Sequence, residues 1–476
     1  MSRHPWKYIL VVCLLCIVYF YGLTRTGLLS ADEPRYASIG REMARSGDWV
    51  TPRLWGVPWF EKPALLYWMT ASAYRLGFDD NLAPRFFVTV FAVAFLIFYF
   101  WILREEFGER PAWFASLILA TSVGWFGFSQ IGVTDLPMSA AFSAAILLCL
   151  KDGTRRSILA GAFLGLAALA KGLVPLALAA PLVIWKRGKP RELFWIGFVC
   201  LGVAGPWYVL CIMRNGWPFI QEFFIKQHFS RIVSDSIQHV QKPWFYVPVL
   251  LAAIFPWTPL LFTLFRKESY GDRRRLLLAC VVVFGFLLFS VSKNKLPGYL
   301  LPLMPALAAL IGLRLAEIAH ARLYLAASGF LAVLGIWVGN ALPQLLSRGS
   351  SGGIPIWEGT LPAVGVGLLL AVLCDQLEIR GFRYAAIGAI SLGFAAGALF
   401  LKIQVYPKID RVASARGLAR ELAGQPVCVE DLNRNWRYGL NFYMITPLPE
   451  CSAADLPIHL TGGHKGPPQI VSRPIQ

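Results

Sequence analysis

The chain has few charged residues for its length. Asp, Glu, Lys and Arg make up 15% of its 476 residues, while 57% of the residues are hydrophobic. The mean hydropathy is +0.56, and long stretches carry no charge at all. A soluble protein of this size is normally far more polar, whereas about 20 consecutive apolar residues span the core of a bilayer. The scarcity of charge excludes an ordinary soluble protein and predicts an all-α polytopic membrane protein.

The chain also lacks a cysteine framework. Nine cysteines are present, and most of them lie in or beside apolar segments. Cys13 and Cys16 have the spacing of a redox or metal pair, but in an apolar helix cysteine serves as a small packing residue. Only Cys428 and Cys451 lie in a polar region, the C-terminal tail. These two could form a disulfide if the tail lies outside the cytoplasm.

Acidic residues are scarce relative to basic ones. The chain has 27 Asp and Glu against 45 Lys and Arg, which gives a formal net charge of +18. In a soluble protein this excess would suggest a nucleic-acid partner. Here the charges lie in loops between apolar segments, where they set the topology and attract anionic lipid headgroups. We therefore expect membrane lipids as partners and no nucleic acid.

Apolar segments of bilayer length recur along the whole chain. The first, 8–23, follows Arg3 and Lys7. No clear small-x-small cleavage site precedes Ala31, so we expect an uncleaved first span rather than a signal peptide. Further spans are expected at 85–103, 112–128, 134–150, 157–170, 172–185, 193–213, 244–265, 276–292, 297–313, 323–342, 357–374 and 384–403. Together they make about thirteen transmembrane helices.

Basic residues concentrate in every second connector between these spans. They lie at 104–110, 151–156, 186–191, 266–275, 314–322 and 380–383. Because cytoplasmic loops carry the excess of Lys and Arg, we expect this side, which also holds the N-terminus, to be cytoplasmic. The polar segments 24–84 and 214–243, the turns at Lys171 and Lys293, and the tail then lie on the opposite face.

The distribution of polarity predicts two domains. Residues 1–403 are expected to form a transmembrane domain, with 24–84 as its catalytic periplasmic loop and 214–243 as a second periplasmic loop. Residues 404–476 are polar and contain an amphipathic helical pattern that ends at Gly424, followed by a short strand pattern. We expect a small periplasmic α/β C-terminal unit that caps the membrane site.

Two acid–proline junctions single out the stretch 30–66 as the place for chemistry. D-E-P at 32–34 is expected to open a helix that runs to Arg45 and stops at a glycine, since proline suits the first turn and glycine the stop. E-K-P at 61–63 repeats the pattern. The second helix, which ends at Gly77, has the Leu, Tyr, Trp and Met content of an interfacial amphipathic helix.

Each junction has a structural and a functional interpretation. Structurally, Asp32 caps its helix, and Lys62 is an anchor whose ammonium reaches the headgroups. Functionally, Asp32 is an acid held at the membrane surface, and Lys62, a cation beside carboxylates, is a phosphate ligand. Capping and catalysis are compatible, so the first interpretation does not remove the second.

Further polar residues stand beside apolar segments. Asp135 heads a span, where an acid is costly unless it is paired and is a functional candidate by default. Lys171 is a lone cation between two apolar segments, and its alternative interpretation is a surface turn. S-K-N-K-L-P-G-Y places Lys293, Lys295 and Tyr299 on one face, with interfacial anchoring as the alternative.

The segment 214–243 groups histidines with basic and aromatic residues. It contains His228, Arg231 and His239. The favoured interpretation is an interfacial helix whose basic residues face lipid phosphates. The two histidines and Glu61 could instead hold a divalent metal, although their spacing matches no standard zinc pattern. We assign no cofactor and leave the metal as an alternative.

The loop motifs resemble those of a known family. D-E-P-R-Y-A, S-G-D-W-V-T-P and F-E-K-P-A-L-L-Y-W are similar to the first periplasmic loop of the bacterial lipid A 4-amino-4-deoxy-L-arabinose transferases. These belong to the GT-C membrane glycosyltransferases, which include the protein O-mannosyltransferases. The later A-K-G, H-F-S-R and S-K-N-K-L-P-G-Y-L-L-P also match in order. The C-terminal unit is shorter than in the known arabinose transferases and does not align.

The resemblance implies a reaction and a set of residues. A sugar would move from undecaprenyl phosphate to lipid A on the periplasmic face of the inner membrane, with inversion at the anomeric carbon. Asp32 would be the central catalytic residue, with Glu61, Lys62 and Asp135 in the same catalytic group. The implied substrate-binding residues are Glu33, Arg35, Tyr36, Lys171, His228, Arg231, Lys293 and Tyr299.

The acceptor decides the role of Asp32. A sugar or serine hydroxyl needs a general base, which would be Asp32. A lipid A phosphate is already anionic, and Asp32 would then orient Lys62 or the acceptor. Transfer to protein hydroxyls is the alternative within this class. A lipid-linked sugar flippase is the alternative from another class, but no inverted repeat or matched pair of broken helices is visible.

Overall fold

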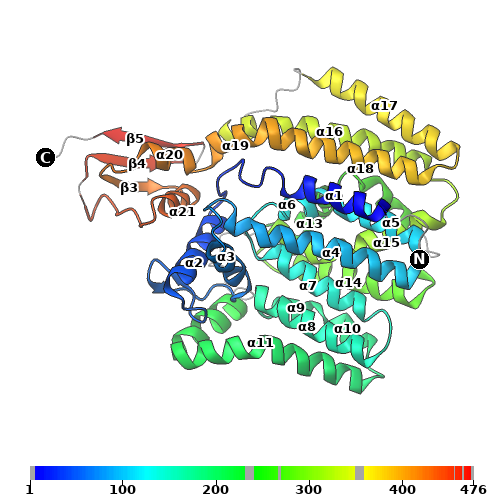
Figure 1. Ribbon diagram of the computed structural model, residues 1–476, viewed down its shortest axis with the longest axis horizontal. Coiled ribbons are helices and arrows are strands. Elements are labelled where there is room, and N and C mark those ends of the chain that lie inside the picture. The colour runs from blue at the N-terminus through cyan, green and yellow to red at the C-terminus, as the bar shows by residue number, and fades with distance from the viewer. Residues whose placement is uncertain are drawn as a thin grey trace.

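The computed structural model describes residues 6–230, 241–265, 270–348, 359–454, 456–463 and 466–472. Most of the chain forms a bundle of long helices (Figure 1). The chain begins at one end of this bundle. A loop module and a small C-terminal unit lie at the other end.

The bundle is built from helices of very different lengths. In chain order they are α1 Trp6–Phe20, α4 Ala83–Phe107, α5 Glu109–Ala120, α6 Val123–Phe128, α7 Asp135–Leu148, α8 Thr154–Lys171, α9 Val174–Leu178, α10 Ala180–Trp185, α11 Pro190–Phe219, η1 Ile220–Ser230, η2 Pro243–Phe245, α13 Tyr246–Ala253, η3 Thr258–Phe265, α14 Arg273–Val291, η5 Pro297–Leu303, α15 Met304–Glu317, α16 Arg322–Arg348, α17 Thr360–Ile379 and α18 Arg383–Phe400.

Seven helices in the described part of the chain are long and apolar enough to cross a membrane, or eight if a bent pair counts as one span. The bent pair, 243–253 and 258–265, turns by 114°. The expected span 172–185 is also broken, into α9 and α10. The fold is therefore that of a polytopic membrane protein, but the count of thirteen is not confirmed, because several expected spans are short or interrupted.

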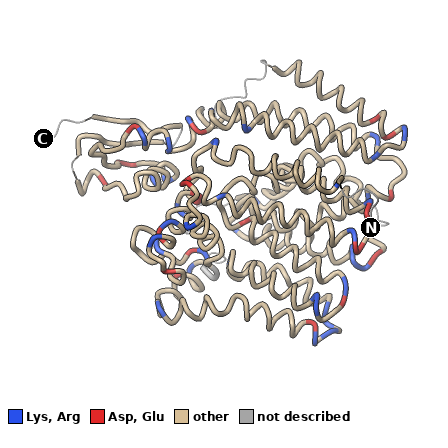
Figure 2. Tube along the Cα trace, in the orientation of Figure 1, with Lys and Arg blue, Asp and Glu red and all other residues tan. Residues whose placement is uncertain are grey.

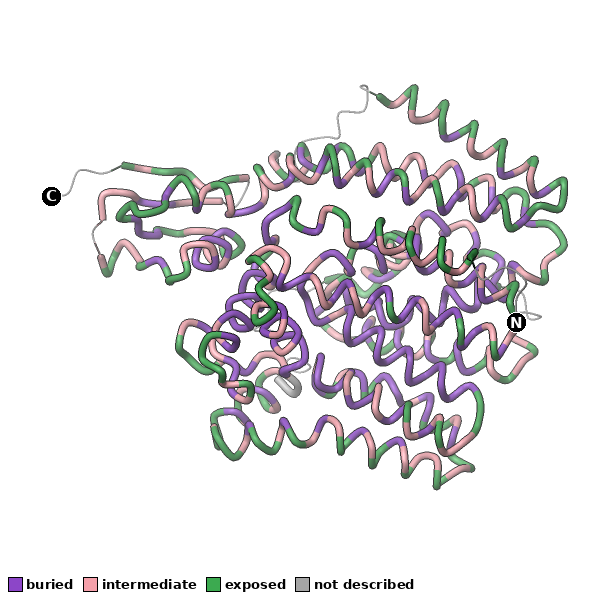
Figure 3. Tube along the Cα trace, viewed as in Figure 1, coloured by how far each residue is buried: buried purple, intermediate pink, exposed green. Residues whose placement is uncertain are grey.

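Burial separates inner from outer helices (Figure 3). The segment 297–317 is 89% buried, whereas 360–379 is 11% buried although it is equally apolar. Leu361 and Leu369 on α17 are 84% and 71% exposed. A helix that is apolar and yet exposed suits a lipid-facing position. The inner helices then form the core that holds the site.

Basic and acidic residues gather in the connectors at the end of the bundle where the chain begins (Figure 2), and ion pairs join them. Arg156 donates to Glu106 at 2.5 Å, and Lys186 donates to Glu192 at 2.7 Å. Arg383 is paired with Glu378. The basic connectors that the sequence assigned to one side thus lie together, as one cytoplasmic face requires.

The loop module contains α2 Asp32–Ser46, the hairpin β1 Arg53–Leu54 and β2 Val57–Pro58, and α3 Leu65–Arg75. The predicted stop of the first helix is confirmed, because Gly47 follows it with φ 73° in the left-handed region. The structural interpretation of Asp32 as a cap of α2 is not confirmed, because the helix starts at this residue without a side-chain cap. Most residues of α3 are buried against the rest of the protein, and its position at the membrane interface stays a prediction.

The C-terminal unit continues directly from the last bundle helix. Its elements are η7 Leu401–Val405, α19 Tyr406–Ala413, α20 Arg416–Glu421, β3 Val427–Leu432, α21 Arg434–Tyr443, β4 Ile458–Gly462 and β5 Pro468–Ser472. The strands form one sheet in the order β3-β4-β5, with β3 parallel to β4 and β4 antiparallel to β5. The helix expected to end at Gly424 is shorter and ends at Glu421. Cys428 and Cys451 form a disulfide.

Hydrogen bonds dock the C-terminal unit onto the first loop. Tyr443 Oη accepts from the Leu28 amide at 2.8 Å and donates to Asn81 Oδ1 at 2.7 Å. Arg41 Nη2 donates to the Phe442 carbonyl at 2.8 Å. These bonds hold α21 beside α2, where the candidate site begins.

Candidate functional site

Arg35 joins the two acid–proline junctions. Its Nη2 donates to Asp32 Oδ1 at 2.5 Å and pairs with Glu61 Oε2 at 2.9 Å. Asp32 and Arg35 are three residues apart on α2, a spacing that places side chains on one helix face. Glu61 comes from the segment before α3. Asp32, Arg35 and Glu61 are called the Arg35 cluster below.

The Arg35 guanidinium is buried and only partly satisfied. The residue is 3% exposed, and its Nε and Nη1 have no hydrogen-bond partner among the described residues. Aromatic rings cover its faces, with Cζ 5.6 Å from the Trp59 ring and 5.4 Å from the Tyr438 ring. Leaving a buried donor unpaired costs about 1–3 kcal/mol, so these N–H groups suit an anionic ligand oxygen.

Arg35 stays protonated although it is buried. Burial lowers the pKa of Arg35, but the neighbouring Tyr36, Glu61 and Asp32 raise the pKa by more, so the net shift is upward. The cation is therefore permanent at any physiological pH. In a poorly hydrated setting such a cation can bind a phosphate through charge-assisted hydrogen bonds.

Tyr36 and Tyr67 lie beside the Arg35 cluster, and their phenol groups are neutral. Their rings lie 6.1 Å apart. Burial, followed by the charges of nearby acids, raises the pKa of both hydroxyls far above the ordinary value. Tyr67 Oη is buried without a partner among the described residues. The two phenols stay protonated and can only donate or accept hydrogen bonds.

Glu33, predicted to bind substrate, forms a buried ion pair with Arg85. Arg85 Nε and Nη2 donate to the two carboxylate oxygens at 2.6 Å and 2.8 Å. Both side chains are 1% exposed. The remaining Arg85 donors reach the carbonyls of Leu23, Thr26 and Gly27. A pair with this many hydrogen bonds offsets the cost of burying its charges.

The same pair fixes the position of a later span. Glu33 Oε1 accepts from the Gly132 amide at 2.8 Å, three residues before Asp135 at the start of α7. The ion pair therefore ties the loop module to the first residues of α4 and to the segment just before α7. Sequence reasoning missed Arg85. Its signal was a lone arginine at the start of an apolar span, on the face without basic connectors.

Asp135, Lys171 and Tyr299 form a second cluster, called the Lys171 cluster below. Lys171 Nζ donates to Asp135 Oδ1 at 2.6 Å and lies 4.6 Å from the centre of the Tyr299 ring. The Lys171 and Asp135 side chains are 9% and 17% exposed. Gly298 packs on this pair, because a Cβ at this position would collide with the Asp135 carboxylate.

The other predicted residues are not brought into either cluster by a described contact. Lys62 lies between Glu61 and Pro63 in the sequence and is half-buried. Lys293 is exposed. Lys295, expected on the same face as Lys293, is buried and donates to the Ser292 carbonyl. His228 lies on η1. Arg231 and His239 fall outside the described residues, and so does the metal set that needs His239.

One group of metal-ligand residues is present in the described ranges, away from both clusters. Cys428, Cys451 and His459 have ligand atoms within 4.8 Å of one another. The two cysteines form a disulfide, and a disulfide sulfur offers no thiolate for a metal. The group is therefore structural.

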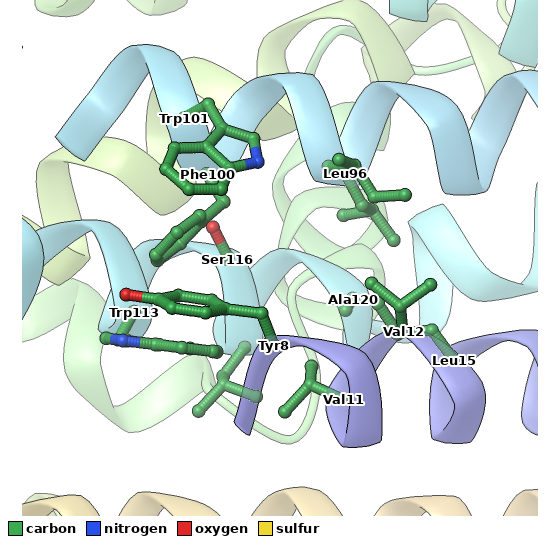
Figure 4. Close-up of a pocket in the computed structure, with 12 residues that line it drawn as sticks. Tyr8, Val11, Val12, Leu15, Leu96, Phe100, Trp101, Trp113, Ser116 and Ala120 are labelled. Carbon is green, nitrogen blue, oxygen red and sulfur yellow. The ribbon is translucent and has the colours of Figure 1, made fainter. Parts of the chain in front are cut away.

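An apolar cavity of about 70 Å³ lies at the end of the bundle where the chain begins. Figure 4 shows Tyr8, Phe100 and Trp113 on its wall. Ser116 is the only polar non-aromatic residue that lines it. Since it contains no charged group and lies away from α2 and α3, this cavity is not the reaction site.

Comparison with known proteins identifies the class of the chain. Residues 61–209 match the family described as dolichyl-phosphate-mannose-protein mannosyltransferase. A relative from Pectobacterium carotovorum, undecaprenyl phosphate-alpha-4-amino-4-deoxy-L-arabinose arabinosyl transferase, is 29% identical over 92% of this chain and 87% of its own length. The protein of that name from Serratia proteamaculans is 36% identical over 64% of this chain and 58% of its own length.

A solved structure matches almost the whole fold. The crystal structure of ArnT from Cupriavidus metallidurans bound to undecaprenyl phosphate superposes with a TM-score of 0.77. The match covers 94% of this chain and 86% of that one, at 26% identity. Together with the apolar helices and the loop clusters, these similarities show that the chain is an ArnT-like glycosyltransferase of the GT-C class, a multi-pass protein of the bacterial inner membrane.

Proposed function

We propose that this enzyme transfers 4-amino-4-deoxy-L-arabinose from undecaprenyl phosphate to lipid A, with inversion at the anomeric carbon. The observation that carries the proposal is Arg35, a buried cation with two unpaired N–H groups beside two acids. The names of the relatives that match most of the chain support the donor and the sugar. Lipid A is the acceptor that the resemblance of the loop motifs implies.

The reaction takes place on the periplasmic face in this proposal. The Arg35 cluster and the Lys171 cluster lie at the end of the bundle opposite the basic connectors. The positive-inside rule supports a cytoplasmic position for those connectors. The short helices α1 and α7 would then cross the membrane as well, which brings the number of crossings toward about thirteen. Residues 404–476 would form a periplasmic domain.

The donor side needs stabilisation of a phosphate. The bond between the anomeric carbon and the undecaprenyl phosphate oxygen breaks, and the phosphate leaves with the bonding electrons. Lys62 and Lys171 would share this charge, which leaves the free N–H groups of Arg35 for the acceptor phosphate. Charge-assisted hydrogen bonds in a water-poor site are worth more than those in water.

The acceptor side needs no base if the acceptor is a phosphate. A phosphate oxygen of lipid A attacks the anomeric carbon from the face opposite the leaving group, so one carbon–oxygen bond forms as the other breaks. At neutral pH this phosphate is already anionic. Asp32 would therefore act as a positioning residue that holds Arg35 from one side, while Glu61 holds it from the other.

The Lys171 cluster would serve as a second anion contact. Lys171 is paired with Asp135 and faces the Tyr299 ring, so its ammonium is oriented before substrate binds. Asp135 would set the position of Lys171 rather than take a proton. This arrangement supports a site with a cation on each side of the transferred sugar.

Mass spectrometry of cell envelopes tests the proposal. Lipid A from cells with the protein should carry an added aminopentose that is missing from cells without it. Transfer to protein hydroxyls, which the mannosyltransferase family match favours, predicts instead the loss of a hexose from envelope proteins. Unchanged lipid A together with a lost protein hexose would overturn the proposal.

A further inference from the structure

An aromatic pair joins the first loop to the C-terminal unit beside Arg35. Trp55 lies between β1 and β2, and Tyr438 lies on α21. Their rings are stacked, with centroids 5.7 Å apart and an interplanar angle of 18°. The Tyr438 ring also lies 5.4 Å from Arg35 Cζ. The pair is thus built by two parts of the chain that are far apart in sequence.

Trp55 occupies a backbone position that suits a small residue. Its φ is 54°, and that of Gly56 is 80°. A two-residue hairpin turn with positive φ at both central positions usually contains Asn, Asp or Gly. A bulky side chain is an outlier there, and such outliers cluster at ligand-binding sites. The position of the indole, rather than the chemistry of the turn, accounts for a tryptophan at this point.

The residues around the pair carry buried N–H groups without partners in the described part of the chain. These are Arg35 Nε and Nη1, Trp55 Nε1 and Trp59 Nε1. Arg35 is 3% exposed, so bulk water does not satisfy its donors. A set of unpartnered donors around a permanent cation favours a ligand rich in oxygen and negatively charged.

We propose that Trp55, Tyr438 and Arg35 form the subsite for the phosphorylated sugar of the acceptor. This inference rests on the proposed function. The flat aromatic pair supplies an apolar surface with polar edges for a sugar ring, and Arg35 supplies the charge for its phosphate. The acceptor is favoured over the donor because the hairpin and α21 lie outside the bundle helices, along which the undecaprenyl chain must lie.

Steady-state kinetics of the full-length protein in detergent test the subsite. The donor is undecaprenyl phosphate-linked aminoarabinose, and the acceptor is lipid A. Tyr438→Ala and Trp55→Phe should each raise the KM for lipid A about ten-fold, as for a truncated contact at the centre of a binding site. The KM for the donor should stay within about two-fold. Phe198→Ala, which removes one ring of a stacked lipid-facing pair, is the matched control and should change neither constant.

The Trp55→Gly variant distinguishes an effect on acceptor binding from an effect on folding. Glycine relieves the positive φ, so the unfolding temperature should be unchanged or higher while the KM for lipid A still rises. A purely structural pair predicts the reverse, with lower stability and an unchanged KM. A rise in the donor KM alone would assign the pair to the donor and overturn the proposal.

Direct binding keeps the inference testable if the wild type transfers nothing to lipid A. Without donor, the wild type should bind phosphorylated lipid A more tightly than dephosphorylated lipid A, and Tyr438→Ala should abolish the difference. Equal binding of both lipids by the wild type would refute the subsite. Absence of transfer with intact selective binding would refute the proposed function alone.

Discussion

Glu33 and Arg85 share a bidentate ion pair in which both side chains are 1% exposed. Their hydrogen bonds reach the end of α1, the start of α2, the first residues of α4 and the approach to α7. The loop module is therefore attached to the bundle by one polar contact as well as by apolar packing. Asp32 and Arg35 of the Arg35 cluster flank Glu33 on α2, so this attachment also fixes the position of the cluster.

Glu33→Gln should lower the free energy of unfolding by roughly 3–5 kcal/mol, because it leaves the buried Arg85 charge without its partner. The thermal stability of the protein in detergent measures this loss. Asp375→Asn, which breaks the exposed pair with Arg322, is the control and should have little effect. Equal losses for the two variants would show that the buried pair does not attach the loop.

Asp32→Asn should reduce the rate of transfer by about 10²-fold or more, as expected when a catalytic cation is misplaced by about 1 Å. The protein should still insert and fold. Because Asp32 positions Arg35 in this account, the residual activity should keep the pH profile of the wild type. A profile that loses its acidic limb would identify Asp32 as a general base instead, and full activity would remove it from the site.

Gly298→Ala should impair transfer without unfolding the protein. The added Cβ would collide with the Asp135 carboxylate and displace it from Lys171. We expect kcat to fall about ten-fold or more, since orientation contributes heavily to such rates. Gly197→Ala on α11, where a Cβ meets nothing within 4 Å, is the matched control. Normal kcat in Gly298→Ala would show that the Lys171 cluster lies outside the reaction path.

Cys428→Ser should destabilise the C-terminal unit. The disulfide closes a loop with a sequence separation of 23 residues, for which chain entropy predicts about 3 kcal/mol of stabilisation. Limited proteolysis should cleave this unit faster in the variant and leave the bundle intact. Cys280→Ser, which alters an exposed free cysteine, should behave as the wild type. Equal proteolysis of all three proteins would show that the disulfide contributes little.

The sequence predicted the local features of the site well. Both acid–proline junctions start or precede helices of the loop module, and the stop at Gly47 is confirmed. Such features depend on proline, glycine and the charge of neighbouring residues, which act over one or two turns. Asp32 and Glu61 both contact the Arg35 guanidinium. All three residues belong to the two acid–proline motifs that the sequence singled out.

Long-range contacts could not be predicted in this way. Arg85 and Tyr438 reach the first loop only through the packing of α4 and α21. Nothing in the local pattern around Tyr438 distinguishes it from other aromatics. Hydrophobic periodicity alone also could not predict the number of membrane spans. Breaks such as the one between α13 and η3 occur within continuous apolar sequence.

The most direct test of the account is transfer by the purified full-length protein from undecaprenyl phosphate-linked aminoarabinose to lipid A, followed by mass spectrometry of both lipids. The account predicts a lipid A product heavier by one aminopentose and an equal amount of free undecaprenyl phosphate, both strongly reduced in Asp32→Asn. Product formation unaffected by this substitution, or donor consumption without any aminopentose on lipid A, would contradict it.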